Sequence, residues 1–225
     1  MLKTIKIGIL ALLCATGIAA NAQKKITEGT ITYGLEYNLP ADKQAMAAML
    51  PQEYKVNFKG DLSKFKMDMG MFSTLVIYNN FSKETLSLTE VPIQSKKIAV
   101  RMNKEQTEKM SEMQGGNKDY EVTPTTEKKL IAGYNCIKYI CKDKDSGAQI
   151  FVWATNDIET PINTLTTSFK NIKGMPIQFS TDARGMKVNI TVKTITEEKV
   201  GDINMDIPKE FETMSFDDLM KQMGG

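Results

Sequence analysis

The sequence predicts an α+β protein that is mostly β and built around one antiparallel sheet. Apolar and polar side chains alternate along much of the chain, which is the period of strands that bury one face. Successive strand patterns are separated by short polar breaks, and this arrangement favours antiparallel neighbours over βαβ units. Helical patterns are few. No linker or internal repeat divides the chain of 225 residues, which indicates a single domain.

The first 22 residues have the pattern of a cleaved secretory signal peptide. Lys3 and Lys6 form a positive head before an apolar run at residues 7–20. This run of about 14 residues is shorter than the ~20 that span a bilayer as a helix. Ala20-Asn21-Ala22 then supplies the small-x-small pattern of a cleavage site. We therefore expect a periplasmic or otherwise exported protein whose single domain spans residues 23–225, with no transmembrane segment in the mature chain.

The charge of the mature chain is balanced. Removal of Lys3 and Lys6 from the 29 basic residues leaves 27, which equals the 27 acidic residues. This balance gives no electrostatic footprint for nucleic acid or for an anionic membrane. Nucleic acid is therefore not an expected partner.

The expected strands follow one another from the start of the mature chain almost to its end. The most regular is 186–195, where Met186, Val188, Ile190 and Val192 alternate with polar residues. The full set comprises 29–37, 53–58, 64–71, 74–78, 84–89, 97–102, 120–123, the less regular 126–131, a hairpin within 134–155 that turns at 143–147, 176–181 and 186–195.

A few segments have a helical pattern. Residues 41–50 lie between the first two strands and offer Met46, Met49 and Leu50 as an apolar stripe. A further helix is expected near 103–116, and another within 161–172.

The second and the last of the expected helices begin with a capping box. Asn103 and Gln106 have the required spacing, as do Ser215 and Asp218 at the start of a C-terminal helix at 215–223. The apolar face of this last helix must pack against the sheet or against a partner.

No constellation of residues indicates an enzyme. The chain has no histidine, which removes Ser-His-Asp triads, Cys-His pairs and histidine-ligated zinc. Cys136 and Cys141 are five residues apart, so on an uninterrupted strand they face opposite sides and stay reduced. We expect a protein without catalytic residues or a cofactor.

The segment KFKMDMGMF, residues 64–72, is the clearest local motif. Read as a strand, it places Phe65, Met67, Met69 and Met71 on one face. Alternate thioethers could bind Cu(I), could form ordinary core, or could line a deformable surface for an apolar ligand. The sequence leaves these alternatives open.

Several longer patterns resemble a known group of exported proteins. These are KGD at 59–61 followed by SKFKMDM, IAGYNCIKY leading into AQIFVWATND, and IKGMPIQF before the last long strand. Together they resemble the exported domain-of-unknown-function (DUF4412-like) and GLPGLI-type proteins of Bacteroidetes, although GMPIQF lacks the second glycine of GLPGLI. Those families are similar in organisation to the LolA/LppX-like lipoprotein-carrier superfamily.

This resemblance implies an antiparallel sheet curled into a half-barrel, with a few helices over its concave face. It also implies a hydrophobic cavity for acyl chains. The residues expected to line that cavity are Phe65, Met67, Met69, Met71, Met46, Met49 and Leu50.

Three functions remain open from the sequence. The first is a non-enzymatic binding protein that holds a lipid acyl chain or another hydrophobic ligand. The second is a structural or accessory protein of the cell envelope with a filled core and a protein partner. The third is a periplasmic Cu(I)-binding protein that uses Met67, Met69 and Met71.

Overall fold

A computed structural model describes residues 23–41, 44, 50–113, 116, 118–183 and 186–224. Most of its strands belong to one 12-stranded sheet with the order β14-β7-β6-β5-β4-β3-β2-β13-β12-β10-β9-β8. Neighbouring strands are antiparallel, except that β14 runs parallel to β7. The predicted fold class is therefore confirmed. The strands are β2 (Glu28–Asn38), β3 (Glu53–Lys59), β4 (Leu62–Asp68), β5 (Ser73–Asn79), β6 (Thr85–Val91), β7 (Lys96–Met102), β8 (Tyr120–Ile131), β9 (Tyr134–Asp143), β10 (Gln149–Thr155), β12 (Met175–Ala183), β13 (Met186–Glu197) and β14 (Glu212–Thr213).

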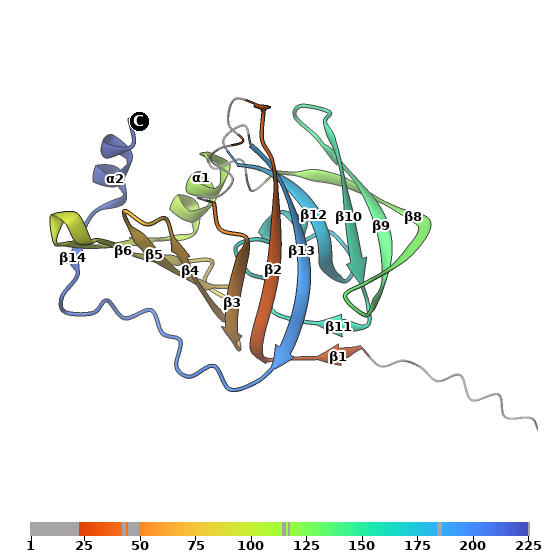
Figure 1. Cartoon of the computed structure of the whole chain (residues 1–225), viewed down its shortest axis with the longest axis horizontal. Coiled ribbons are helices and arrows are strands. Elements are labelled where there is room, and N and C mark those ends of the chain that lie inside the picture. Colours follow the sequence, from red (N-terminus) through yellow and green to blue (C-terminus); the bar gives the residue numbers. More distant parts are fainter. Residues whose placement is uncertain are drawn as a thin grey trace, which may run out of the picture.

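The sheet has two parts, a curled barrel and an open wing (Figure 1). Strands β2, β3, β13, β12, β10, β9 and β8 curl around one hydrophobic core, and β4–β7 extend from it as the wing. The face that carries this core is the inner face. The largest side chains buried in it include Tyr33 and Phe58. The half-barrel expectation is confirmed.

A loop, rather than a helix, fills the interior of the barrel. The helix expected within 161–172 is wrong, because only η3 (Thr167–Phe169) forms a short 3₁₀ turn there. The side chain of Asn163 accepts from Leu165 N–H at 3.0 Å, and Thr166 Oγ1 accepts from Asn163 N–H at 3.1 Å. Such local bonds to side chains compete with a helix. They allow Phe169 to turn inward and pack against the aromatic side chains of the core.

A long extended segment, residues 199–211, crosses the outer face of the wing, and we call it the strap. Figure 1 shows it running from the end of β13 beneath the wing to β14. Ile203 is buried, and its neighbours in the strap cover a second apolar cluster on the wing. The wing contributes Ile77, Leu86, Leu88, Ala99, Leu62 and Leu75 to this cluster, and the strap contributes Ile203, Val200, Met205, Ile207 and Phe211.

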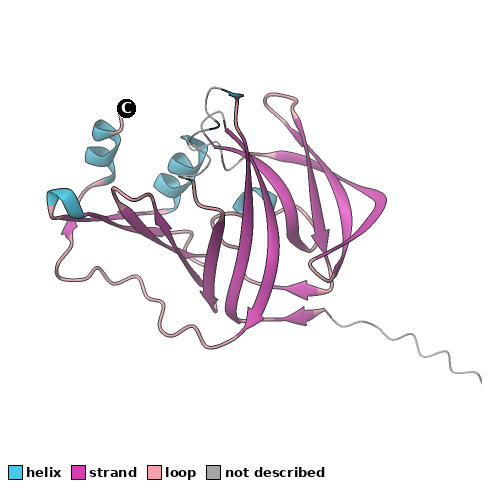
Figure 2. Cartoon of the chain, in the orientation of Figure 1, coloured by secondary structure: helices cyan, strands magenta, loops and turns pink. Residues whose placement is uncertain are grey.

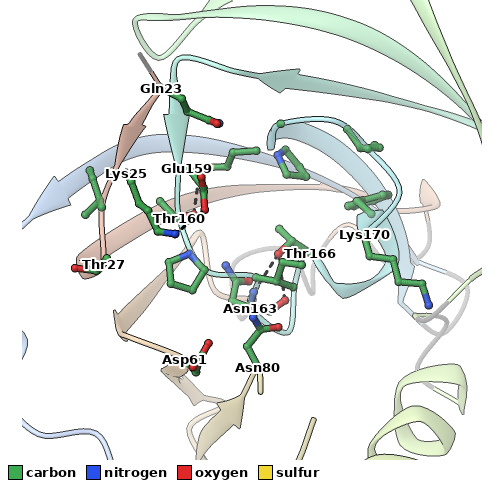
Figure 3. Close-up of a pocket in the computed structure, with 18 of the residues that line it drawn as sticks. Gln23, Lys25, Thr27, Asp61, Asn80, Glu159, Thr160, Asn163, Thr166 and Lys170 are labelled. Carbon is green, nitrogen blue, oxygen red and sulfur yellow. Dashed lines mark hydrogen bonds and ion pairs between the residues drawn. The ribbon is translucent and has the colours of Figure 1, made fainter. Parts of the chain in front are cut away.

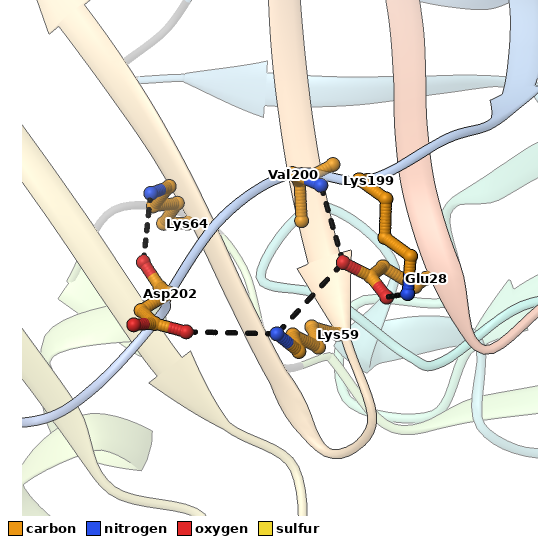
Figure 4. Close-up of polar contacts among 6 residues, drawn as sticks. All are labelled: Glu28, Lys59, Lys64, Lys199, Val200 and Asp202. Atoms are coloured by element: carbon orange, nitrogen blue, oxygen red, sulfur yellow. Dashed lines mark hydrogen bonds and ion pairs between the residues drawn. The ribbon is translucent and has the colours of Figure 1, made fainter.

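Charged residues anchor the start of the strap (Figure 4). Glu28 Oε1 accepts from Val200 N–H at 3.2 Å, and the other carboxylate oxygen of Glu28 lies 3.5 Å from Lys199. Lys59 lies 3.9 Å from Glu28 and 3.6 Å from Asp202, so it links the barrel to the strap.

After the strap, the chain turns around the edge of the sheet. β14 adds to the outer edge of β7, and α2 (Phe216–Gln222) then packs on the inner face of the wing. Its predicted capping box is confirmed, since Ser215 Oγ accepts from Asp218 N–H at 3.1 Å and bonds its carboxylate at 2.7 Å. The C-terminal helix therefore docks on the sheet of its own chain.

Helix α1 (Lys104–Met113) packs beside α2 on the same wing (Figure 2). Its capping box forms as predicted, with Gln106 N–H donating to Asn103 Oδ1 at 2.9 Å. Met110 is buried against β7, whereas Met113 stays exposed. The helix expected at 41–50 lies mostly outside the described residues.

Strand β4 ends three residues earlier than the alternation of methionines predicts. The ladder between β4 and β5 stops at the pair Asp68 and Ser73. Asp68 Oδ1 then accepts from Gly70 N–H at 2.9 Å, and Gly70 has a positive φ of 75°. Met69 and Met71 consequently lie in a hairpin turn, and they do not continue the face of Met67.

Candidate ligand-binding cleft

A cleft of about 560 Å³ opens at the end of the barrel where the chain enters it. Here β1 (Lys24–Lys25) pairs in parallel with β11 (Ile158–Glu159), forming a separate two-stranded sheet. The turn between β3 and β4, the turn between β5 and β6, and the loop that fills the barrel complete the walls. The residues that line the cleft are Gln23, Lys25, Ile26, Thr27, Tyr33, Gly60, Asp61, Asn80, Glu159, Thr160, Pro161, Ile162, Asn163, Thr166, Phe169, Lys170, Ile172, Gly174, Met175 and Pro176.

The rim of the cleft is polar and charged (Figure 3). Lys25 and Glu159 face each other from paired strands, with Lys25 Nζ 3.2 Å from the carboxylate. Both side chains are largely exposed, so this ion pair adds little to stability. On the opposite wall, Asp61 and Asn80 come from adjacent turns, joined by a 2.7 Å bond from Asn80 N–H to the Asp61 carbonyl.

The floor of the cleft combines apolar side chains with a buried polar pair. Ile26, Phe169 and Ile172 are buried there. Asn163 Nδ2 donates to the Tyr33 hydroxyl at 3.0 Å, and both residues are buried. Burial raises the pKa of Tyr33 to about 12, so its hydroxyl stays protonated at neutral pH.

The Tyr33 hydroxyl acts only as an acceptor in the hydrogen bonds of the described residues. Its oxygen receives the Asn163 bond, and no hydrogen bond donated by this hydroxyl is formed there. A buried donor without a partner is costly, and an acceptor on a bound ligand would remove that cost. The floor can therefore hold an apolar chain and offer one hydrogen bond to an oxygen atom of the same ligand.

None of the described residues expected from the sequence lines this cleft. Phe65 is half-buried on the inner face, with its ring 5.7 Å from that of Tyr54, and Met67 is half-buried one step further along β4. Leu50 is also half-buried, whereas Met69 and Met71 are exposed, and the seven predicted residues include Met46 and Met49 outside the described residues. The predicted cavity lining stays a prediction.

Sequence reasoning missed the cleft because its central contact joins distant residues. Tyr33 and Asn163 are 130 positions apart. Tyr33 looks like any inward residue of an alternating strand, and Asn163 looks like a turn residue after Pro161. No spacing rule relates them.

The geometry assumed for a copper site is wrong. Three thioethers on one strand face require β4 to continue to Met71, but the strand ends at Asp68. Among the described residues, no group of three or more His, Cys, Asp or Glu side chains is placed to hold a metal ion.

Cys136 and Cys141 are free and buried in the described structure. Burial raises the pKa of each thiol to about 11. A thiol with so high a pKa is a poor nucleophile at neutral pH. The structure agrees with the expectation of two packed cysteines that form no disulfide, although both belong to the core of the barrel rather than to opposite sides of the strand.

The fold and the cleft define a class, namely a curled antiparallel sheet with a loop-filled interior and a small cleft at one end. Comparison with solved structures gives a match to PNGF-II with a TM-score of 0.51 and 14% identity, over 88% of this chain and 33% of that one. This chain therefore spans about a third of the length of PNGF-II. At this identity the likeness concerns the fold alone.

Two mycobacterial proteins show a weaker likeness. LprF from Mycobacterium bovis matches with a TM-score of 0.34 and 12% identity, over 79% of this chain and 90% of that one. The lipoprotein LppX from Mycobacterium tuberculosis matches with a TM-score of 0.34 and 10% identity, over 80% and 90%. These TM-scores are too low to carry a functional argument. No family model matches the sequence, and neither does any curated protein.

Within the described residues, no helix combines the length and apolar character needed to cross a membrane.

Proposed function

We propose that this chain is an exported, non-enzymatic binding protein that holds an amphiphilic ligand, an acyl chain with a polar end, in the cleft. The observation that carries this proposal is buried Tyr33, which lines a cleft of about 560 Å³ and whose hydroxyl accepts a bond from Asn163 but donates none among the described residues. Small-molecule sites commonly enclose ~300–1,000 Å³ and combine apolar walls with a few placed polar groups.

The distribution of polar groups supports an amphiphile rather than a plain hydrocarbon. The apolar floor of Ile26, Phe169 and Ile172 would receive the chain. The charged rim, including Lys25 and Lys170, would meet a polar or anionic end. Tyr33 would donate to an ester or carbonyl oxygen at the junction between the acyl chain and its polar end.

A second candidate is a structural or accessory protein of the envelope with a filled core. The observation that favours it is the loop that packs Phe169 and Ile172 into the barrel. In that case the cleft holds only water, and function resides in a surface that meets a protein partner.

A ligand-binding assay separates the two candidates. The exported chain is purified without detergent, bound lipid is sought by native mass spectrometry, and a fluorescent fatty acid is titrated. Ile162→Trp narrows the cleft and should weaken binding of the probe at least tenfold. Leu130→Trp introduces the same ring at an exposed position that is not part of the cleft lining and should leave binding of the probe unchanged.

The sequence-predicted residues are tested in the same assay. If Phe65→Gln with Met67→Gln abolishes binding and Ile162→Trp does not, the ligand lies on the inner face of the wing. If no lipid co-purifies and no probe binds to the unmodified protein, the filled-core function replaces this proposal.

A further inference from the structure

We infer that the β4–β5 hairpin tip and the lysines behind it form a docking surface for an anionic lipid bilayer. The tip is residues 69–72, and it exposes Met69 and Met71 to solvent, at 37% and 68% of their surface. Because neighbouring strands alternate in direction, the turn that carries Ile93, which is 83% exposed, lies at the same end of the wing. Three apolar side chains therefore protrude from one end of the sheet.

The backbone of the tip can enter an apolar layer at little cost. Met69 N–H donates to the Phe72 carbonyl at 3.0 Å, and Met71 N–H donates to the Met69 carbonyl at 2.9 Å. Gly70 N–H donates to the Asp68 carboxylate. Since unpaired amides are what make loops unfavourable in lipid, a tip in which three of the four N–H groups are already bonded is suited to shallow insertion.

A cluster of lysines lies directly behind the tip on the outer face. Three lysines and one carboxylate line a shallow groove there, whose residues are Glu53, Lys55, Asn57, Lys64, Phe65, Lys66 and Leu75. None of these lysines forms an ion pair within the described residues; Lys64 donates to a backbone carbonyl of the strap at 3.2 Å. The carboxylate of Glu53 in the same groove is bonded by Lys193 at 2.6 Å, and Lys55 contributes less than Lys193 to the lowered pKa of Glu53. The groove therefore keeps a net positive charge.

Only Lys64 in this cluster forms a side-chain hydrogen bond among the described residues, the one to the strap. Like charges on adjacent strands repel, so three neighbouring lysines on one face oppose folding unless an anion neutralises them. The mature chain is neutral as a whole, so the cluster is a local concentration of positive charge that the overall composition conceals. Positive charge beside exposed apolar tips complements an anionic bilayer, whose surface attracts lysines and whose interior accepts methionine.

The distance of each lysine from the hairpin tip decides how strongly it is attracted to the lipid surface. At ~3.4 Å per residue, Lys66 lies about 7 Å from the end of β4 at Asp68, and Lys64 about 14 Å. Lys55 precedes the pairing of Val56 with Phe65 and is therefore level with Lys66. With a screening length of ~8 Å at physiological salt, Lys55 and Lys66 would act most strongly on the lipid surface.

This docking surface is independent of the proposed cleft, which opens at the opposite ends of β4 and β5, beside Asp61 and Asn80. A variant can therefore lose binding to lipid vesicles without losing ligand binding in the cleft, and the reverse. The Ile162→Trp variant should retain full vesicle binding.

The test is co-sedimentation of the exported chain with phosphatidylglycerol–phosphatidylcholine vesicles and with phosphatidylcholine vesicles. Met69→Ser with Met71→Ser should weaken binding to the anionic vesicles on the order of tenfold, because two apolar side chains lose their lipid contact. Lys55→Gln with Lys66→Gln should weaken it by up to about fivefold per lysine and reduce its dependence on salt. Lys64 is left intact because it holds the strap.

The matched control variants change similar side chains away from the docking surface, at the opposite end of the wing and at the edge of the sheet formed by β8. Phe81 is 84% exposed in the β5–β6 turn, at the opposite end, so Phe81→Ser should leave binding unchanged. Lys128→Gln with Lys142→Gln removes two exposed lysines from β8 and β9 and should also leave it unchanged. Thermal melts confirm that each variant folds.

Three results would overturn the inference. They are an absence of binding to the anionic vesicles, equal binding to phosphatidylcholine vesicles, and equal losses in the Phe81→Ser control and the methionine variant. Loss in the lysine variant without loss in the methionine variant would also overturn it, since the surface would then bind anions without entering lipid.

Discussion

The strap offers a direct test of how the outer face of the wing is stabilised. Ile203 is 8% exposed and packs with Ile77, Leu86 and Leu88, which would otherwise face solvent. Truncation of a buried isoleucine to alanine costs about 2–5 kcal/mol. The strap is a single extended segment that can settle toward the sheet, so Ile203→Ala should cost about 2 kcal/mol, at the low end of that range. For a domain of this size, ~2 kcal/mol lowers Tm by about 4–8 °C.

The matched control is Ile93→Ala, which makes the same chemical change at a side chain that is 83% exposed. That variant should lose less than about 0.5 kcal/mol. Thermal unfolding followed by circular dichroism, with urea unfolding for the free energy, measures both. Limited proteolysis should also cut the strap faster in Ile203→Ala. If the two variants have the same Tm, the strap does not protect the wing and the reasoning is refuted.

Three further outcomes are expected. Cys136 and Cys141 should not react with a thiol reagent in the native protein at neutral pH, since burial raises each pKa to about 11, and both should react in denaturant. Asp143→Ala should lower the free energy of unfolding, measured in urea, by about 1.5–3 kcal/mol, and Asp143→Asn should lower it by less. The reason is that backbone N–H groups donate to the Asp143 carboxylate, which also lowers its pKa. That stabilisation is present above the unfolded pKa of about 4 and disappears as pH falls through the lowered folded value. The pKa of Glu28 is lowered mainly by its bond from Val200 N–H. Protonation of Glu28 should therefore lower the protection factor of the Val200 amide, which compares its exchange rate with the intrinsic rate at the same pH, and Glu28→Gln should remove this pH dependence.

Much of the sheet could be predicted from the sequence because alternation is a local signal. The alternation in 186–195 and the polar turn at 143–147 each reflect forces that act within a few residues. The capping boxes at Asn103 and Ser215 are equally local, and both form. In β8 the register shifts between Pro124 and Lys128, so the two strands expected there are one interrupted strand. Alternation within a few residues does not predict that they join.

The parts that could not be predicted depend on contacts between distant residues. Ile203, Met205 and Ile207 alternate like a strand, yet among the described residues this segment pairs with no strand and instead covers the wing. Its path is set by side chains such as Glu28 and Lys59, far away in the sequence. The cleft has the same origin, because its floor forms only when the loop around Asn163 folds into the barrel.

The methionine run shows why alternation alone does not define a face. Met67, Met69 and Met71 keep a period of two, but Asp68 and Gly70 between them form a turn that Asp favours with its carboxylate and Gly with its positive φ. The turn residues Asp68 and Gly70 are visible in the sequence, but the regular spacing of the methionines favours a strand. The consequence is chemical as well as geometric. Three thioethers converging on a metal, or lining a covered cavity, must share one face, whereas two thioethers at an exposed tip are suited to contact with lipid. The same residues therefore support a surface function that their spacing does not suggest.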